Sequence, residues 1–347
     1  MIYFDLTNTI VTQLEKIHSV WGVISNAQIV PGWEQKLRRI ARLRSSVFST
    51  RIEGNQMTLG EAEAFLAGEK ITARPRDKKE LKNYLSVLEY IETQEFTAEI
   101  TDQQIFRIHT LTTNGILSSG LQNKYREQQN AIYDQTGGLV YMPPEHKDVK
   151  KLMSGMLNFI NHQNEISPLI RAALLHHWFV IIHPFVDGNG RSARALTQLF
   201  MYQHGFNTKK YFSLEEYYDA DLQNYYRAIN IGHNFYESQE RQINSTTFIE
   251  YFLRGVAQEL TRLKDQIATI KDETPFLASL KKLDLSNRQI HLVLFVQERG
   301  KVKSADFLQP FNLSLATVKR ELKKLVDRQV LVRQGSGKNS MYIIKNP

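Results

Sequence analysis

One run of nine residues, from His183 to Arg191, constrains this chain more than any other feature, and Arg194 follows it three positions later. The run reads His-Pro-Phe-Val-Asp-Gly-Asn-Gly-Arg and combines a base, an acid, a glycine-flanked turn and cations. Histidine can accept a proton near neutral pH, and aspartate is a hard oxygen ligand of the kind that Mg²⁺ prefers beside phosphate. The two glycines let the backbone turn sharply and approach an anion closely. Together these residue types predict a polyphosphate site.

The segment after the turn, from Arg191 to His204, is predicted to be a helix because its apolar residues recur at helical spacing. The N-terminus of a helix attracts negative charge. Arg191 and Arg194 would share one face of its first turn, where they oppose the helix dipole unless an anion binds between them. A loop that merely caps a helix would explain any one of these residues, but not all of them together.

The run resembles the signature of the Fic family, His-Pro-Phe-x-Asp/Glu-Gly-Asn-Gly-Arg-x-x-Arg, at every specified position. Fic proteins mostly transfer AMP from ATP to a hydroxyl of a target protein, so the resemblance implies ATP and Mg²⁺ as cofactors. It also implies that His183 is the general base and that Asp187 is the Mg²⁺ ligand. Arg191 would hold phosphate oxygens, and Arg194 the γ-phosphate. The residues that the resemblance assigns to ATP binding are Gly188, Asn189, Gly190, Arg191, Ser192, Ala193 and Arg194.

A second motif lies upstream, at the end of a helix predicted from Trp33 to Ser49. Ser49, Glu53 and Gly54 match the family's autoinhibitory pattern Ser/Thr-x-x-x-Glu-Gly/Asn, whereas a glutamate beside a helix-ending glycine would by itself be surface decoration. The resemblance implies that the glutamate pairs with the second arginine of the signature, Arg194. Arginine and carboxylate can form a directional, bidentate pair, which would occupy the position that the γ-phosphate needs.

A third pattern predicts a β-hairpin from Tyr133 to Pro144, with β-forming residues on both sides of a Gly-Gly pair. Such a hairpin needs no function of its own in a helical protein. In Fic proteins a hairpin at this place is the flap, which holds the target chain by strand addition. Its tip here would be Thr136, Gly137, Gly138 and Leu139.

Two other groups of residues carry weaker signals. His176 and His177 point to different faces of one predicted helix, so His176 is expected to be a core histidine rather than a metal ligand. Paired tyrosines at 217–218 and 225–226 lie on amphipathic segments and are typical of packing. The resemblance suggests Tyr225 as a residue of the adenine pocket.

Composition narrows the class of protein. The 347-residue chain contains no cysteine, which is typical of a reducing compartment and predicts a cytoplasmic location. Residues 1–17 lack the continuous apolar core of a signal peptide, and no apolar run approaches the length of a membrane span. No membrane partner is expected.

Positive charge is concentrated at the end of the chain. Residues 281–347 hold 14 Lys and Arg against 5 Asp and Glu, although the whole chain carries a net charge of only +8. This segment predicts three helices (287–298, 304–308 and 315–329) and a two-stranded tail around Gly335–Gly337, the pattern of a winged helix-turn-helix. Lys319, Arg320, Lys323 and Lys324 would form a basic face suited to DNA phosphates. The same fold could serve dimerisation or docking of a target instead.

These patterns together predict a mainly α protein with a Fic helical core, a hairpin flap and a small C-terminal winged-helix domain. The expected divisions are an N-terminal helical segment (1–95), the Fic core (96–236), a linker helix (237–274, ending at a break at Glu273–Pro275) and the winged-helix segment (275–347). The predicted function is transfer of AMP to a Ser, Thr or Tyr hydroxyl of a target protein, inhibited by Glu53. Removal of AMP, transfer of another phosphate-bearing group, and a DNA-binding regulator with an inert Fic core are the alternatives. Besides the target protein, the partners considered are DNA and a second copy of the chain.

Overall fold

The computed structural model describes residues 3–27, 31–94, 99–133, 136–206, 210–311, 313–335 and 340–345. It is mainly helical, with two small sheets, as the sequence predicted. The chain divides into two compact units, Met1–Ile267 and Ala268–Pro347. None of the described helices combines the length and the low charge that crossing a bilayer requires.

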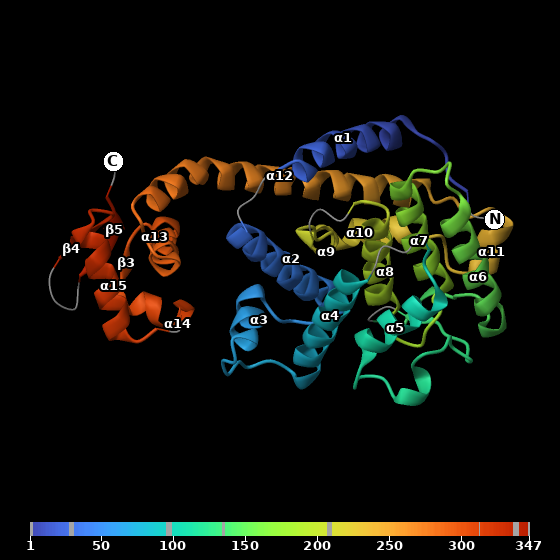
Figure 1. Cartoon of the computed structure of the whole chain (residues 1–347). Helices are drawn as coiled ribbons and strands as arrows, with labels where there is room; N and C mark the ends of the chain where they lie inside the picture. Colours follow the sequence, from blue (N-terminus) through green and yellow to red (C-terminus); the bar gives the residue numbers. More distant parts are fainter. Residues whose placement is uncertain are drawn as a thin grey trace. The chain divides into compact units, whose positions relative to one another are not determined.

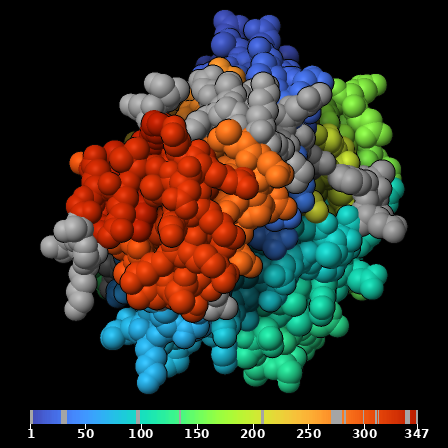
Figure 2. Space-filling view, turned by 60° about the vertical axis from the view of Figure 1, so that its left-hand side comes forward, coloured from blue at the N-terminus to red at the C-terminus, as the bar shows by residue number. Residues whose placement is uncertain are grey.

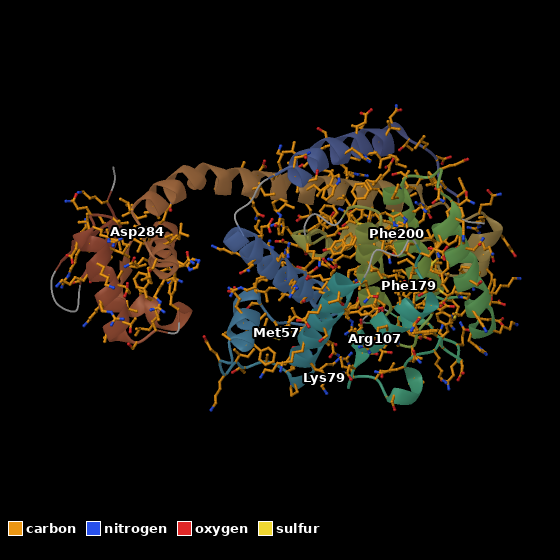
Figure 3. All side chains as sticks on the ribbon, viewed as in Figure 1. Met57, Lys79, Arg107, Phe179, Phe200 and Asp284 are labelled. Atoms are coloured by element: carbon orange, nitrogen blue, oxygen red, sulfur yellow. The ribbon has the colours of Figure 1, made fainter. Side chains whose placement is uncertain are left out.

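The first unit is a bundle built around two helices, α7 (Pro168–Ile182) and α8 (Asn189–Gln203) (Figure 1). Both are buried along most of their length, and Phe179 and Phe200 lie among the side chains that fill the bundle (Figure 3). Apolar residues occupy almost every face of α7, which is the composition expected of a fully enclosed helix. Pro168 suits its first turn, where a backbone N–H has no helical partner.

The other helices among the described residues of this unit surround that pair. They are α1 (Asn8–Ser25), α2 (Pro31–Arg51), α3 (Leu59–Leu66), α4 (Pro75–Thr93), α5 (Asp102–Thr113), the short η1 (Ser119–Leu121), α6 (His146–His162), α9 (Glu215–Ala220), α10 (Leu222–Ile229), α11 (Phe235–Glu240) and the first part of α12 (Thr246–Lys282). Capping boxes at Thr58 and Thr101 begin α3 and α5, because each threonine pairs with a Glu or Gln three residues on. A hydrogen bond of 2.6 Å from Thr7 to Glu250 joins α1 to α12, and the two helices run side by side in Figure 1.

The predicted hairpin is present as β1 (Ile132–Tyr133) and β2 (Leu139–Tyr141), which pair antiparallel. Residues 134–135 of the predicted segment lie outside the described residues. Beyond β2, Met142 exchanges backbone hydrogen bonds with His233 and Phe235 at 2.8 and 3.0 Å. The hairpin is therefore tied at its base to the chain before α11.

The second unit combines helices with a three-stranded antiparallel sheet in the order β3-β5-β4, and its described residues are orange to red in Figure 2. Its elements beyond α12 are α13 (Asn287–Arg299), β3 (Val302–Lys303), η3 (Ser304–Phe307), α14 (Leu308–Phe311), α15 (Leu315–Asp327), β4 (Leu331–Gln334) and β5 (Met341–Ile344). The helices and the two strands of the tail thus appear where the sequence predicted them, whereas β3 is a third strand that was not predicted. Of the predicted wing tip, Ser336 and Gly337 lie outside the described residues, and the winged-helix assignment stays a prediction.

The predicted break at Glu273–Pro275 is wrong, because α12 continues through it to Lys282. A proline inside a helix costs about 3 kcal/mol through one missing hydrogen bond and a steric clash. That cost is outweighed here by the helical hydrogen bonds and packing of α12 before and after Pro275. The C-terminal part of α12 carries Leu280 into the core of the second unit. The boundary between the two units falls inside this helix, after Ile267.

Candidate active site

The loop from His183 to Arg191 connects α7 to α8, and its own side chains hold its shape. His183 ends α7 in the left-handed conformation, with φ of 51°. The amide of Asn189 binds both backbone groups of Phe185, accepting from its N–H and donating to its carbonyl at 2.9 Å. Arg126 donates from Nε to the carbonyl of His183 at 2.9 Å, and its backbone N–H donates to the carbonyl of Pro184. These hydrogen bonds fix the shape of the loop.

His183 is held as a neutral base. Burial, reinforced by the positive charge of Arg126, lowers the pKa of His183 to about 4, although a hydrogen bond to the backbone of Val180 and the carboxylates of Glu53 and Asp187 counteract this shift. An unprotonated imidazole at neutral pH is the form that can accept a proton.

The N-terminus of α8 directly follows the loop that begins at His183. The first N–H groups of a helix have no hydrogen-bond partner within the helix and can bind an anion. Gly188 precedes α8 with φ of +79°, and a Cβ there would lie 2.8 Å from Thr113, so glycine is required for both conformation and space. Asp187 accepts from the N–H of Gly188 at 2.5 Å and keeps 39% of its side chain exposed. Arg191 is 2% exposed and lies with Nη2 3.4 Å from Asp187. This combination of helix N-terminus, arginine and carboxylate suits a metal-bound polyphosphate.

The structure brings the predicted inhibitory residues onto Arg194, which is 141 to 145 positions away in the sequence. Arg194 donates from Nε to Ser49 Oγ at 2.9 Å, and from Nη2 to the Ser49 carbonyl and to Glu53 Oε1, both at 2.8 Å. Burial opposes the charge of Arg194, but the Glu53 carboxylate together with Tyr225 and Tyr84 outweighs it, so that the pKa of Arg194 lies above its usual value. Ser49 and Glu53 therefore both contact the arginine that the resemblance assigned to the γ-phosphate.

Glu53 also lies against the N-terminus of α8. A Cβ placed on Gly190 would be 2.2 Å from Glu53 Oε1 and 3.1 Å from Arg194 Nη1. Only glycine at this position leaves room for a carboxylate at the helix N-terminus. Negative charge is favourable there, and the Glu53 carboxylate occupies a position where a phosphate would be bound.

Three contacts hold the end of α2 and the turn after it, which carries Glu53. The hydroxyl of Tyr226 donates to the carbonyl of Ile52 at 3.2 Å, and Arg74 donates to the carbonyl of Gly54 at 2.9 Å. Gly54 itself has φ of +90°, the left-handed conformation expected of a residue that ends a helix. The third contact is an ion pair of 3.4 Å between Arg51 and Asp219 on α9. Glu53 is therefore positioned by its backbone as well as by Arg194.

Other residues predicted for nucleotide binding are buried beneath this site. Ser192 and Ala193 are at most 1% exposed, on the inner face of α8. Tyr225 is 2% exposed, and its hydroxyl lies 3.0 Å from His176 Nε2. His176 is thus a hydrogen-bonded core histidine, as predicted, whereas a place for Tyr225 in an adenine pocket stays a prediction. A small cavity of about 20 Å³ lies between Arg194, His176 and Tyr218, room for a single water molecule.

The predicted flap tip is exposed. Thr136, Gly137, Gly138 and Leu139 all face solvent, with Leu139 at 43%. Asn130, just before β1, lies 3.4 Å from the carbonyls of Phe185 and Val186. The hairpin therefore stands beside the loop that carries His183.

A metal would depend on Asp187 here. The described residues contain no group of three or more His, Cys, Asp or Glu side chains that could enclose an ion. Mg²⁺ commonly binds through one or two carboxylates while substrate phosphates and water complete its octahedron. One exposed carboxylate at the N-terminus of α8 fits a magnesium ion that arrives with a nucleotide, and does not fit a site made by protein alone.

Comparison with known proteins agrees with this geometry. Residues 99–201 match the sequence profile of the Fic/DOC family. This region is a Fic domain. It contains the whole of the signature, while Ser49, Glu53 and Gly54 lie outside it.

Similar proteins support the Fic assignment. Protein adenylyltransferase Fic of Drosophila melanogaster is 28% identical over 205 residues, which cover 56% of this chain and 39% of the relative. Protein adenylyltransferase fic-1 of Caenorhabditis elegans is 28% identical over 177 residues, 49% of this chain and 34% of the relative. The chain therefore matches well under half the length of these curated relatives.

Solved structures share the fold. A Fic family protein from Desulfovibrio desulfuricans aligns with a TM-score of 0.69 at 22% identity, covering 100% of this chain and 99% of that one. Residues 134–508 of Fic-1 from C. elegans align with a TM-score of 0.58 at 21% identity, covering 76% of this chain and 74% of that one.

Sequence reasoning missed several residues around the Fic signature. Glu80 and Arg76, on α4, reach Arg191 and Asp187. His109, on α5, stacks on Phe185 with ring centroids 3.7 Å apart, and its Nε2 donates to the carbonyl of Asp187 at 3.0 Å. No local pattern marks these residues, because each acts through a partner that lies far away in the sequence.

Proposed function

We propose that this chain is a protein adenylyltransferase, which moves AMP from ATP to a Ser, Thr or Tyr hydroxyl of a target protein and which Glu53 inhibits. The observation that carries the proposal is the meeting of a neutral His183, the carboxylate of Asp187 and the N-terminus of α8 at one point beside an exposed hairpin. The relatives named protein adenylyltransferase support the same reaction.

In this reaction His183 would accept the proton of the target hydroxyl while the hydroxyl oxygen attacks the α-phosphorus of ATP. The bond between the α-phosphorus and the bridging oxygen to the β-phosphate breaks, and pyrophosphate leaves with that oxygen. Arg191 and the N–H groups of α8 would stabilise negative charge on the phosphates. Magnesium held by Asp187 would neutralise further charge on the same oxygens.

Glu53 would act by competition for Arg194. With the pair formed, the γ-phosphate lacks its arginine and meets a carboxylate at the N-terminus of α8. ATP could still bind, but not in a pose that aligns its α-phosphorus with the incoming hydroxyl. Release of Glu53 would therefore switch the enzyme on.

The test is label transfer from ATP. Wild type, Glu53→Gly and His183→Ala are incubated with ATP labelled in the α- or the γ-phosphate, and label in protein is measured. The proposal expects α-label in protein, more with Glu53→Gly, and none with His183→Ala although that variant still binds ATP. Transfer of γ-label would instead show a phosphate transferase. Loss of AMP from a modified target with wild type, but not with Glu53→Gly, would show that Glu53 also serves AMP removal.

A second function, DNA binding through the second unit, is favoured by the surface of α15. The apolar side chains Val318, Leu322 and Leu325 are buried in the core of the second unit. On the other face of α15, Lys319 and Lys323 are exposed and have no ion-pair partner among the described residues. Arg320 and Lys324 are also exposed, although both lie near the buried Glu321, at 3.5 and 3.4 Å. Fluorescence anisotropy of the full chain with mixed-sequence duplex DNA at low salt tests this function. No binding below roughly 100 µM would favour docking or self-association instead.

Two predictions about the cellular setting stay with this proposal. The cysteine-free sequence favours a cytoplasmic location, and cell fractionation would test it. A homodimer remains a prediction that the molar mass in solution would decide.

A further inference from the structure

Arg126 is a buried arginine in the loop between η1 and β1, and it makes no ion pair with the described residues. It is 4% exposed. A buried cation needs hydrogen-bond acceptors to offset the loss of its hydration, and the acceptors of this guanidinium are three backbone carbonyls. The backbone around Arg126, rather than one carboxylate, therefore determines where its charge lies.

Two of its hydrogen bonds join Arg126 to the loop that carries His183. The Nε of Arg126 donates to the carbonyl of His183, and the backbone N–H of Arg126 donates to the carbonyl of Pro184, both at 2.9 Å. His183 ends α7. A cation is favourable at the C-terminus of a helix, where the last carbonyls have no helical partner.

The conformation of His183 depends on such contacts. Its φ of 51° is left-handed, which is unfavourable for a residue that has a side chain. A conformation of this kind persists only where the surrounding structure holds it. Arg126 therefore helps to direct the imidazole of His183.

The other two hydrogen bonds join Arg126 to both ends of the hairpin. Its Nη1 donates to the carbonyl of Gln128 at 3.0 Å, before β1, and its Nη2 donates to the carbonyl of Pro144 at 2.5 Å, after β2. The rigid fork of arginine can reach carbonyls in several fixed directions, whereas lysine presents a single ammonium group. One guanidinium thus holds the two ends of the hairpin together and holds them against the loop.

Two other residues connect the hairpin to the catalytic loop or to α7, but in a different way. Tyr141 on β2 donates to a backbone carbonyl of α7 at 3.0 Å and does not reach His183. Asn130 lies 3.4 Å from two carbonyls of the loop, which is long for a hydrogen bond. Of these three residues, Arg126 is the one that contacts both the base of the hairpin and the backbone of His183.

We propose that Arg126 is a positioning residue that fixes the hairpin and His183 relative to each other, so that a hydroxyl on a chain bound along the hairpin lies within reach of the imidazole. The inference rests on the proposed function, because it takes the hairpin as the element that holds the target. A general base must lie within hydrogen-bonding distance of the proton that it accepts. Arg126 acts through backbone carbonyls and does not contact the reacting atoms.

The test compares Arg126→Gln with Arg171→Gln in full-length protein that also carries Glu53→Gly. Arg171 is a matched control, because it is 3% exposed and donates to the backbone carbonyl of Ile160 at 2.8 Å, but lies in the first turn of α7, at the opposite end from His183. Amide hydrogen exchange is followed in the base of the hairpin (128–133 and 139–144) and in the loop (183–187). Calorimetry measures the affinity for an ATP analogue with a non-hydrolysable α,β bridge. The initial rate of α-label incorporation into the protein is measured at saturating ATP and Mg²⁺.

Arg126→Gln should speed exchange about tenfold in both segments, the factor expected when one hydrogen bond to a charged group is lost. Label incorporation should fall about 100-fold, as expected for a small displacement of reacting groups. The affinity for the ATP analogue should not change, because Arg126 has no contact with the N-terminus of α8, and Arg171→Gln should change none of the three quantities. A merely structural role would weaken nucleotide binding together with labelling. That result, faster exchange in only one of the two segments, or unchanged labelling overturns the inference.

Where Arg126→Gln shows no cooperative melting, Arg126→Lys takes its place, because it keeps the charge but lacks the fork. Smaller changes in exchange and labelling in the same directions support the inference, and no change in either overturns it. If the Glu53→Gly parent incorporates no label, the proposed function is wrong and the inference about transfer falls with it. The exchange comparison then still decides whether Arg126 joins the hairpin to the loop.

Discussion

Replacing Glu53 by glycine removes the one carboxylate that contacts Arg194 among the described residues, and leaves the other hydrogen bonds of Arg194 in place. Arg194 keeps two hydrogen bonds to Ser49, from Nε at 2.9 Å and from Nη2 at 2.8 Å. The side chain of Arg194 is 1% exposed and that of Glu53 is 29% exposed. The arginine should therefore stay positioned, while the space beside Gly190 becomes open to a phosphate.

The size of the effect follows from the contact between Arg194 and Glu53. At 2.8 Å, two unit charges attract by about 6 kcal/mol at an effective dielectric constant of about 20. Much of this is cancelled by the loss of hydration of both groups, which leaves about 1.5–3 kcal/mol, the usual value for a hydrogen bond to a charged group. Without Glu53 the γ-phosphate no longer has to displace this contact, so its binding to Arg194 becomes more favourable by the same free energy. We therefore expect AMP transfer to rise about 10- to 150-fold.

The assay measures the initial rate of α-label incorporation into the protein itself and into added target proteins, at saturating ATP and Mg²⁺. Glu92→Gly is a suitable control. Glu92, on α4, pairs with Arg42 on α2, the helix that precedes Glu53, but this pair lies outside the site. The control should lose some stability and gain no activity. Equal labelling by wild type and Glu53→Gly would refute the reasoning, as would equal activation by Glu92→Gly.

Three further outcomes are expected. Gly190→Ala should lower the melting temperature of wild type, because its Cβ would lie 2.2 Å from Glu53 Oε1, but should not lower it in Glu53→Gly; an equal loss in both would show that the clash is elsewhere. Burial lowers the pKa of His109 to about 4, so the unfolded chain, with a histidine pKa of about 6.5, binds more protons between these values. The free energy of unfolding should therefore fall as the pH drops from about 6.5 towards 4, and His109→Gln should reduce that fall in denaturant titrations at pH 7 and 5; an identical fall would contradict the pKa. Replacing Lys319 and Lys323 by alanine should weaken DNA binding and reduce the slope of log affinity against log salt by about one unit for each lysine that had neutralised a phosphate; an unchanged slope would place the DNA-binding surface elsewhere.

Local sequence determined the elements that carry the chemistry. The Gly-Asn-Gly turn and the apolar spacing after it predicted the helix that became α8, and the same reasoning predicted most of α2, α13 and α15. These predictions succeeded because capping, glycine conformation and helical periodicity act within a few residues. The break at Pro275 was wrong for the same reason, since a local proline signal takes no account of what the helix packs against on either side.

The contact between Glu53 and Arg194 came from likeness to a family and not from residue patterns, because 141 positions separate the two residues. Only the tertiary structure decided how the ends of α2, α4 and α8 converge. Asn55 and Glu80 are 25 positions apart and carry no motif, yet packing of α4 against both other helices buries them together at Arg191. A buried charge must find its counter-charge wherever the fold provides one, and that place follows from the packing of whole helices rather than from any short stretch of sequence.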